Sequence, residues 1–289
     1  MQPRASETFD ASANGSERGE ASPRRSRRFP PLRTVLTVLV LIAFLGYHLY
    51  SGTASTSNST YSSGAYVFGE YMNGIIRFIF PFIVTVLAAM PLLDQLAENF
   101  IAFTRGRIPL TQHIGHLIVG GVVRNALYFG VLGVLTTLAA AYLAPALQPH
   151  LINPQPFGLT ASEAVQRTAG QDPLGFAIAG GPIAYGLLAT PWMIFGASMF
   201  TLAAIATALT VGRRLIALLV PLAVYILQSV AAFAANASPW SLLMQFPTPS
   251  QLSSFPLVPA ITPAICIGLL SAAVILIALK RSRVSGLYS

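Results

Sequence analysis

Four charged residues are grouped in one short polar interval of a chain that otherwise carries few charges. The interval, residues 94–113, reads DQLAENFIAFTRGRIPLTQH and contains Asp94, Glu98, Arg105 and Arg107. Only 9% of the 289 residues are charged, so this grouping stands out. Carboxylates beside guanidinium groups favour ionic contact with a polar partner. Acid–base catalysis by the two carboxylates is the alternative, and we disfavour it because both are expected to face solvent beside the arginines.

The first part of the interval has the spacing of an amphipathic helix. Apolar residues recur three and four positions apart, at Leu93, Leu96, Ala97, Phe100 and Ile101. Negative charge near the start of a helix is stabilised by the helix dipole, which suits Asp94 and Glu98. Gly106 and Pro109 are residues that end helices, and Thr111 can cap the next one. The interval is therefore predicted to form a short helix and a turn.

Composition places this interval in an integral membrane protein. The sequence is 54% hydrophobic and 9% charged. A soluble domain is about 45–50% apolar and about 25% charged. The net charge of +8 could indicate a nucleic-acid partner. However, the arginines lie in short clusters at the ends of apolar segments, where they are better explained by membrane orientation. We therefore expect contact with membrane lipids and no nucleic acid.

Long apolar runs predict an all-α membrane protein with six transmembrane helices. The predicted spans are residues 34–50, 75–93, 125–143, 185–209, 215–235 and 261–279. Together they form a transmembrane domain over residues 34–283. A basic leader, residues 1–33, is predicted to be disordered and cytoplasmic, because it is polar and rich in Ser, Gly, Pro and Arg. Residues 284–289 form a short cytoplasmic tail.

Two of these assignments have alternatives. Residues 34–50 could be a cleaved signal peptide, but the polar leader before them is too long for the usual n-region, so an uncleaved anchor is favoured. Arg124 could mark the inner membrane boundary, which leaves 114–123 as an interfacial segment and 125–143 as a clean span. In the other interpretation Arg124 lies inside the helix bundle, where it needs a partner.

Basic residues predict the orientation of the spans. The connections assigned to the cytoplasm contain most of the arginines, whereas the external connections 144–183 and 236–259 contain only Arg167. This asymmetry is the positive-inside pattern, and it places both termini in the cytoplasm. Arg77, at the outer end of the second span, is expected to extend outward. The interval 94–113 is then a cytoplasmic coupling helix between spans 2 and 3.

Small residues predict where the helices pack closely. Glycines occur at 120, 121, 130 and 133, and the fourth span contains the sequence GASMFTLAAIATA. Small side chains let membrane helices approach one another, so we interpret these positions as packing contacts rather than ligand sites. Cys266 is the only cysteine, which excludes a disulfide within the chain, and it is interpreted as a packing residue.

The interval and its two apolar neighbours, FIFPFIVTVLAAMPLL and HIGHLIVGGVVRNALYFGVLGVL, resemble the permease subunits of ABC-2 type transporters. The resemblance implies that Asp94, Glu98, Arg105 and Arg107 contact a separate ABC ATPase subunit. It also implies a second permease subunit, identical or related, in an ATP-driven exporter of the cell membrane. The long basic leader and the connection 144–183 depart from the family pattern.

Several catalytic motifs are missing from the sequence. Lys280 is the only lysine and follows an apolar run, so no G-x-x-x-x-G-K-[ST] phosphate loop exists and ATP hydrolysis is assigned to the partner chain. His113 and His116 could share a helix face, but two imidazoles without a third ligand make a poor zinc site. We predict no enzyme activity, cofactor or metal. A non-transport protein (a self-protection factor, scaffold or sensor anchor) is the alternative function, and an intramembrane enzyme is a third. The cargo is not identified.

Overall fold

The computed structural model describes residues 32–57, 59–97, 110–211, 213–245 and 257–285. These residues are almost entirely helical and contain no β-strand. The only extended pairing among them is an isolated parallel bridge between Tyr61 and Ile152. The predicted leader lies almost wholly outside the described residues.

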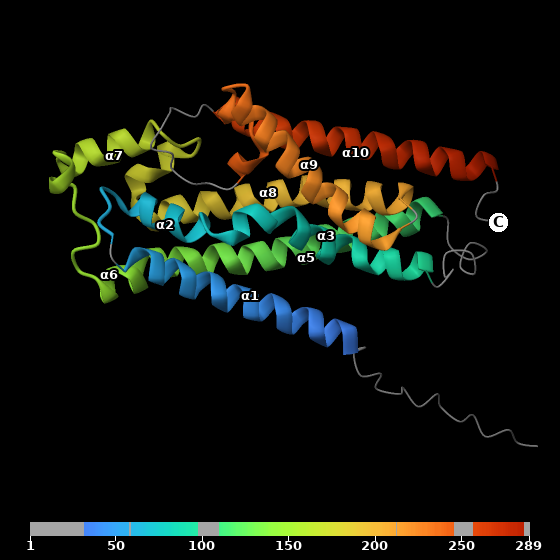
Figure 1. Ribbon diagram of the computed structural model, residues 1–289, viewed down its shortest axis with the longest axis horizontal. Helices are drawn as coiled ribbons and strands as arrows, with labels where there is room; N and C mark the ends of the chain where they lie inside the picture. The colour runs from blue at the N-terminus through green and yellow to red at the C-terminus, as the bar shows by residue number, and fades with distance from the viewer. Residues whose placement is uncertain (1–31, 58, 98–109, 212, 246–256, 286–289) are drawn as a thin grey trace, which may run out of the picture. The chain divides into compact units, whose positions relative to one another are not determined.

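Six helices in the described part of the chain are long and apolar enough to cross a membrane. They are α1 (Leu32–Thr56), α3 (Ile75–Ala97), α5 (Leu110–Leu138), α8 (Gly181–Thr210), α9 (Arg214–Ala234) and α10 (Leu257–Ser285). All six predicted spans fall on these helices, so the chain is a multi-pass membrane protein with an all-helical fold (Figure 1).

The third of these helices is longer than the sequence pattern suggested. α5 begins at Leu110, passes through Arg124 without a break and continues as a π-helical turn (Ala139–Leu143) and α6 (Ala144–Leu147). The continuous segment has 38 residues, a length of about 57 Å, whereas the bilayer core is about 30 Å thick. Residues 114–123, expected to be a separate interfacial segment, are therefore part of one helix that extends beyond the bilayer core.

The chain divides into two compact units between Leu41 and Ile42, inside α1. Among the described residues, the first unit contains only the start of α1, whose apolar side chains are largely exposed. The second unit contains the rest of α1 and all the other described helices.

α8 is the central helix of the second unit. It packs against α5, α10 and α3, and α9 packs on both α3 and α8. Many buried side chains of α8 are small, including Ala189, Ala197 and Ala204. The small-residue pattern of the fourth span therefore predicted close packing correctly.

Two glycines bring α5 and α8 together in a reciprocal contact. A Cβ atom added at Gly133 of α5 would overlap the side chain of Thr190 of α8, and one added at Gly186 of α8 would overlap Thr137 of α5. Gly121 is also close-packed, because a Cβ atom there would lie 3.0 Å from Thr201 Cγ2. These contacts confirm the packing interpretation for Gly121 and Gly133.

Three prolines inside the helices release carbonyl oxygens that side chains of other helices bind. Proline has no N–H group, so the carbonyl four residues earlier loses its usual helical partner. Pro81 releases the carbonyl of Arg77, which accepts a 2.7 Å hydrogen bond from the Tyr225 hydroxyl of α9. Pro91 releases the carbonyl of Leu87, which accepts a 2.7 Å hydrogen bond from Nε of Arg124 of α5.

The same arrangement joins α8 to α9. Pro221 releases the carbonyl of Ala217, and the Thr207 hydroxyl of α8 lies 3.2 Å from it. The same hydroxyl is 2.9 Å from the Ala204 carbonyl of its own helix, so its single proton is shared between the two. Unsatisfied backbone groups are costly inside a membrane, because no water is available to pair with them. The three hydrogen bonds therefore connect α5, α8 and α9 to one another through the points where proline interrupts α3 and α9.

An aromatic cluster lies beside one of these points. The Phe80 ring of α3 packs edge to face against Phe129 of α5 and Phe200 of α8, with centroid distances of 5.0 and 5.6 Å. Phe200 also packs against Tyr225 of α9, at 5.8 Å. Edge-to-face pairs contribute roughly 0.5–1.5 kcal/mol beyond the area that they bury. The cluster thus holds four helices together around the Tyr225 hydroxyl.

Both arginines that the sequence placed at membrane boundaries have partners inside the protein. Arg124 donates to the Leu87 carbonyl, which is the kind of partner that the alternative interpretation, inside the bundle, required. Arg77 was expected to extend outward. Its Nε donates to the carbonyl of Leu243 over 3.3 Å and its Nη1 donates to Asn73 Oδ1 over 2.9 Å, so the side chain bonds protein groups that lie before α3 and after α9. Arg77 thereby joins α3 to the turn that follows α9.

Shorter helices cover one end of the second unit. They are α2 (Gly64–Met72) before α3, and α6, α7 (Ala161–Ala169) and the 3₁₀ turn Gly175–Gly180 between α5 and α8. α7 begins with a capping box, in which Thr160 and Glu163 bond each other's backbone N–H groups. The connection 144–183, predicted as an external loop, is thus largely helical.

The proline arrangement predicts a coupling between Pro81 and Tyr225. Tyr225→Phe removes only the hydroxyl, leaves the Arg77 carbonyl unpaired and should lower the free energy of unfolding by about 1–3 kcal/mol. Pro81→Ala supplies a backbone N–H for the same carbonyl. In that background Tyr225→Phe should therefore lower the free energy of unfolding much less. The measurement is a double-mutant cycle from unfolding curves in mild detergent.

Tyr142→Phe, at an exposed side chain, is the control and should be neutral in both backgrounds. If Tyr225→Phe lowers the free energy of unfolding equally with and without Pro81, the proposed pairing is contradicted.

Candidate functional site

The candidate site lies where α3 ends and α5 and α9 begin. Its floor is an apolar cluster contributed by α3, α5, α8, α9 and α10, with the fully buried residues Ala88, Leu92 and Ala204 at its centre. Leu279, near the end of α10, packs against the same cluster. The cluster therefore brings the end of α3, the start of α5, the end of α8, the start of α9 and the end of α10 together at one end of the second unit.

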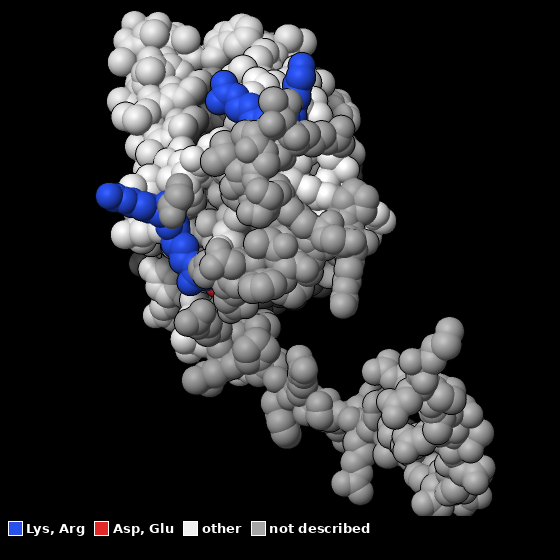
Figure 2. Space-filling model, turned by 90° about the vertical axis from the view of Figure 1, so that its right-hand side faces the viewer, with Lys and Arg blue, Asp and Glu red and all other residues white. Residues whose placement is uncertain are grey.

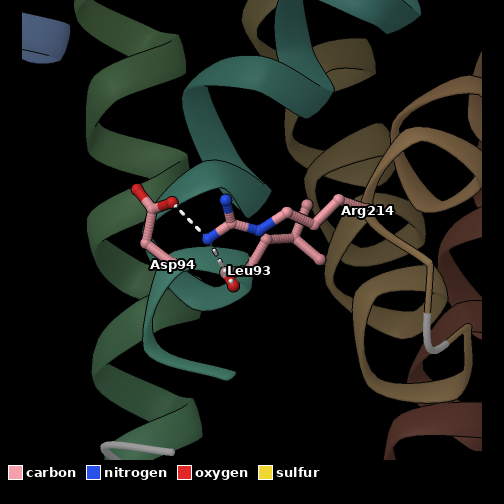
Figure 3. A network of polar contacts seen from close by, with 3 residues as sticks. All are labelled: Leu93, Asp94 and Arg214. Carbon is pink, nitrogen blue, oxygen red and sulfur yellow. Dashed lines mark hydrogen bonds and ion pairs between the residues drawn. The ribbon is translucent and has the colours of Figure 1, made fainter. Parts of the chain in front are cut away.

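An ion pair joins α3 and α9 above this cluster. Arg214 Nη2 lies 2.7 Å from Asp94 Oδ1, and the same nitrogen donates to the Leu93 carbonyl over 3.2 Å (Figure 3). Leu93 and Asp94 lie in the last turns of α3. Arg214 thus binds both a side chain and the backbone of α3.

The connection between α8 and α9 positions Arg214. α8 ends at Thr210, and Val211 and Arg213 are extended, so α9 starts only four residues later at Arg214. Arg214 and Asp94 are 43% and 37% exposed. An ion pair at such exposure contributes about 0.2–1 kcal/mol. The ion pair therefore fixes the position of the end of α3 against α9 more than it contributes to overall stability.

A second polar contact joins α3 to the start of α5. His113 Nε2 lies 2.7 Å from Gln95 Oε1, with both side chains partly buried. His113 and His116 were considered together as a two-residue group, but the partner of His113 is on α3. Asp94 and Gln95, adjacent in sequence, therefore connect the end of α3 to α9 and α5 respectively.

Basic side chains gather around this end. Figure 2 shows two groups of them on the face where α3 ends. In the described part of the chain the basic residues here are Arg213 and Arg214 at the start of α9, and Lys280 and Arg281 near the end of α10. At the opposite end the described residues include Arg167 on α7 and the partly buried Arg77.

Of the four residues predicted to contact an ATPase, the structure places one. Asp94 forms the ion pair with Arg214, whereas Glu98, Arg105 and Arg107 lie outside the described residues. The sequence analysis treated Arg214 only as a marker of orientation. Its pairing with Asp94 spans 120 positions, and no local pattern signals a contact of that separation.

No protein-family description, curated protein or solved structure matches this chain.

The ion pair predicts a modest, salt-sensitive coupling between Asp94 and Arg214. In a cycle of Asp94→Asn, Arg214→Gln and the double variant, the coupling energy should be about 0.2–1 kcal/mol in low salt. It should fall in 1 M salt, where the screening length is about 3 Å. Unfolding in detergent at the two salt concentrations measures both values.

Arg213→Gln is the matched control, because it removes the same charge one residue away and forms no ion pair with Asp94 in the described structure. A coupling of Asp94 to Arg213 as large as that to Arg214 would show that the 2.7 Å contact has no specific effect.

Proposed function

We propose that this chain is the membrane-spanning permease subunit of an ATP-driven exporter of the ABC-2 type, energised by a separate ATPase chain. The observation that carries the proposal is the Asp94–Arg214 ion pair, which joins the start of the interval 94–113 to the α8–α9 connection. The end of α3 and the start of α9 thereby lie side by side at one end of the bundle. A soluble motor subunit needs such a surface, because it must push on several helices together.

The distribution of charge supports a cytoplasmic position for this surface. Arg213, Arg214, Lys280 and Arg281 surround it, and arginine and lysine are retained on the cytoplasmic side of membranes. In this orientation both termini and the interval 94–113 are cytoplasmic, and α2 and α7 lie outside. The membrane is then the cell membrane.

The sequence supports an energy source outside the chain. No phosphate loop is present, and a carrier driven by protons or sodium usually has carboxylates near mid-membrane. The described acidic residues, Glu70, Asp94, Glu163 and Asp172, all lie at or beyond the ends of the membrane-capable helices. ATP-driven closure of two motor subunits against two permease subunits would displace α3 at Asp94, and the ion pair would carry α9 with it.

Photo-crosslinking tests the proposed partner. A photoreactive amino acid in place of Phe103 should capture a polypeptide that contains a G-x-x-x-x-G-K-[ST] sequence, identified by mass spectrometry. Arg105→Glu together with Arg107→Glu should reduce this product severalfold, because both charges are expected at the contact. The same photoreactive group at Phe157, which is exposed at the opposite end, is the control.

Capture of a chain without an ATP-binding sequence, or a yield unchanged by the charge reversals, would overturn the coupling assignment and favour a non-transport membrane protein.

Cysteine labelling tests the proposed orientation. Cys266 is the only cysteine, so Cys266→Ser gives a background without thiols. In intact cells a membrane-impermeant maleimide should label Ser162→Cys on α7 and leave Arg105→Cys unlabelled, because residue 105 is proposed to face the cytoplasm. In permeabilised cells the maleimide should label the cysteine at either position. Labelling of residue 105 in intact cells would place the interval outside and rule out contact with a cytoplasmic motor.

A further inference from the structure

A polar cavity lies at the end of the second unit opposite Asp94. Its volume is about 400 Å³, within the range of about 300–1,000 Å³ that is usual for small-molecule sites. The connection between α1 and α2 forms one wall, and α2, the turn before α7 and α7 itself form the others (Figure 1). The side chains that matter for binding are Tyr61, Tyr66, Glu70, Arg167 and Gln171.

Hydrogen bonds between distant parts of the chain hold the cavity walls together. The Tyr61 N–H donates to the Leu151 carbonyl over 2.8 Å, and the Asn153 N–H donates to the Tyr61 carbonyl over 2.9 Å. The buried hydroxyls of Ser63 and Thr168 are 3.1 Å apart and connect the start of α2 to α7. The cavity is therefore part of the fold and not a gap between loosely placed loops.

The cavity has an acidic side and a basic side. Burial raises the pKa of Tyr61, and the negative charge of Glu70 raises it further, so this carboxylate lies near Tyr61. Burial also raises the pKa of Tyr66, whereas the positive charge of Arg167 opposes that shift. Within the described structure no ion pair joins Glu70 to Arg167. Both charged side chains line the same cavity.

Hydrogen-bonding groups surround these charges. The Tyr66 hydroxyl donates to Gln171 Oε1, which fixes the amide and leaves its nitrogen as a donor. The hydroxyls of Ser59 and Ser62 also line the cavity. A phosphate group accepts more hydrogen bonds than a carboxylate, so it suits a wall that combines a guanidinium with several donors.

The cavity lies beside the ends of two membrane-capable segments. Its lining starts just after Thr56, where one membrane-capable segment ends, and Glu70 lies just before Ile75, where the next begins. The headgroup layer is about 5–8 Å thick on each side of the hydrocarbon core. From the ends of these segments we expect both soluble molecules and lipid headgroups to reach the cavity.

We propose that this cavity binds a zwitterion in which an amine and a phosphate are a few atoms apart, as in phosphoethanolamine. Arg167 binds the phosphate, because its guanidinium offers paired donors that match phosphate oxygens. Glu70 binds the ammonium group, and the neighbouring Tyr61 ring offers it a cation–π surface. The free molecule and the headgroup of phosphatidylethanolamine share this chemistry. The site is independent of the proposed ATPase contact.

Calorimetry on the full chain in dodecyl maltoside tests the site, with O-phosphoethanolamine, ethanolamine and inorganic phosphate as probes. O-phosphoethanolamine should bind at least about tenfold more tightly than either fragment, because only it engages both charges. Glu70→Gln and Arg167→Gln should each weaken its binding about tenfold. Glu163→Gln, on the same helix as Arg167 but outside the cavity, keeps a capping side chain and should bind as wild type does.

The fragments distinguish loss of a charge from loss of the fold. Glu70→Gln should weaken ethanolamine binding and spare phosphate, and Arg167→Gln should do the reverse, a pattern that misfolding cannot produce. Equal binding of the zwitterion by wild type and both variants, or phosphate binding as tight as that of the zwitterion, overturns the proposal.

Nanodiscs identify the source of the ligand. Native mass spectrometry of protein released from nanodiscs of mixed phosphatidylethanolamine and phosphatidylglycerol should show the former enriched if the site takes a headgroup, with the enrichment lost in Arg167→Gln. Calorimetric binding without this enrichment supports a free zwitterion. Absence of both overturns the site and leaves the ATPase proposal unaffected, because that proposal is tested by crosslinking at residue 103.

Discussion

A proline inside a membrane helix leaves a carbonyl oxygen without its usual donor, and the bilayer core holds no water to replace it. In this protein the missing donors come from neighbouring helices. Tyr225 and Arg124 bind the two carbonyls released in α3, and Thr207 binds the one released in α9. Pro81, Pro91 and Pro221 thus each have a side chain of a neighbouring helix at the carbonyl that they release, and these bonds fix contacts of α3 with α9 and α5 and of α9 with α8.

Hydropathy and small residues predicted the helices and part of their packing. All six apolar runs are helices, and the glycines at 121 and 133 are close contacts, because both properties depend on residues near each other in sequence. The partners of Arg77 and Arg124 could not be predicted in the same way. A charge at the edge of an apolar run looks the same whether it reaches water or a carbonyl 37 residues away.

The same limit applies to the candidate site. The sequence grouped Asp94 with the arginines of its own interval, and local spacing gave no reason to consider Arg214. The structure pairs them across 120 positions because the short α8–α9 connection brings the start of α9 to the end of α3. The role of Glu98, Arg105 and Arg107 stays a prediction, since they lie outside the described residues.

α3 connects the proposed motor contact to the proposed zwitterion cavity. Its last turns bind Arg214, its middle carries Phe80 in the aromatic cluster, and Arg77 near its start bonds Asn73, which directly follows α2. α2 carries Glu70, so a shift of α3 along its axis would displace one charged wall of the cavity while α7 holds the other. Such a shift can couple two sites only if α3 has two stable positions. The Tyr225–Arg77 hydrogen bond joins α3 to α9 as the Asp94–Arg214 pair does, so the two helices would have to move together.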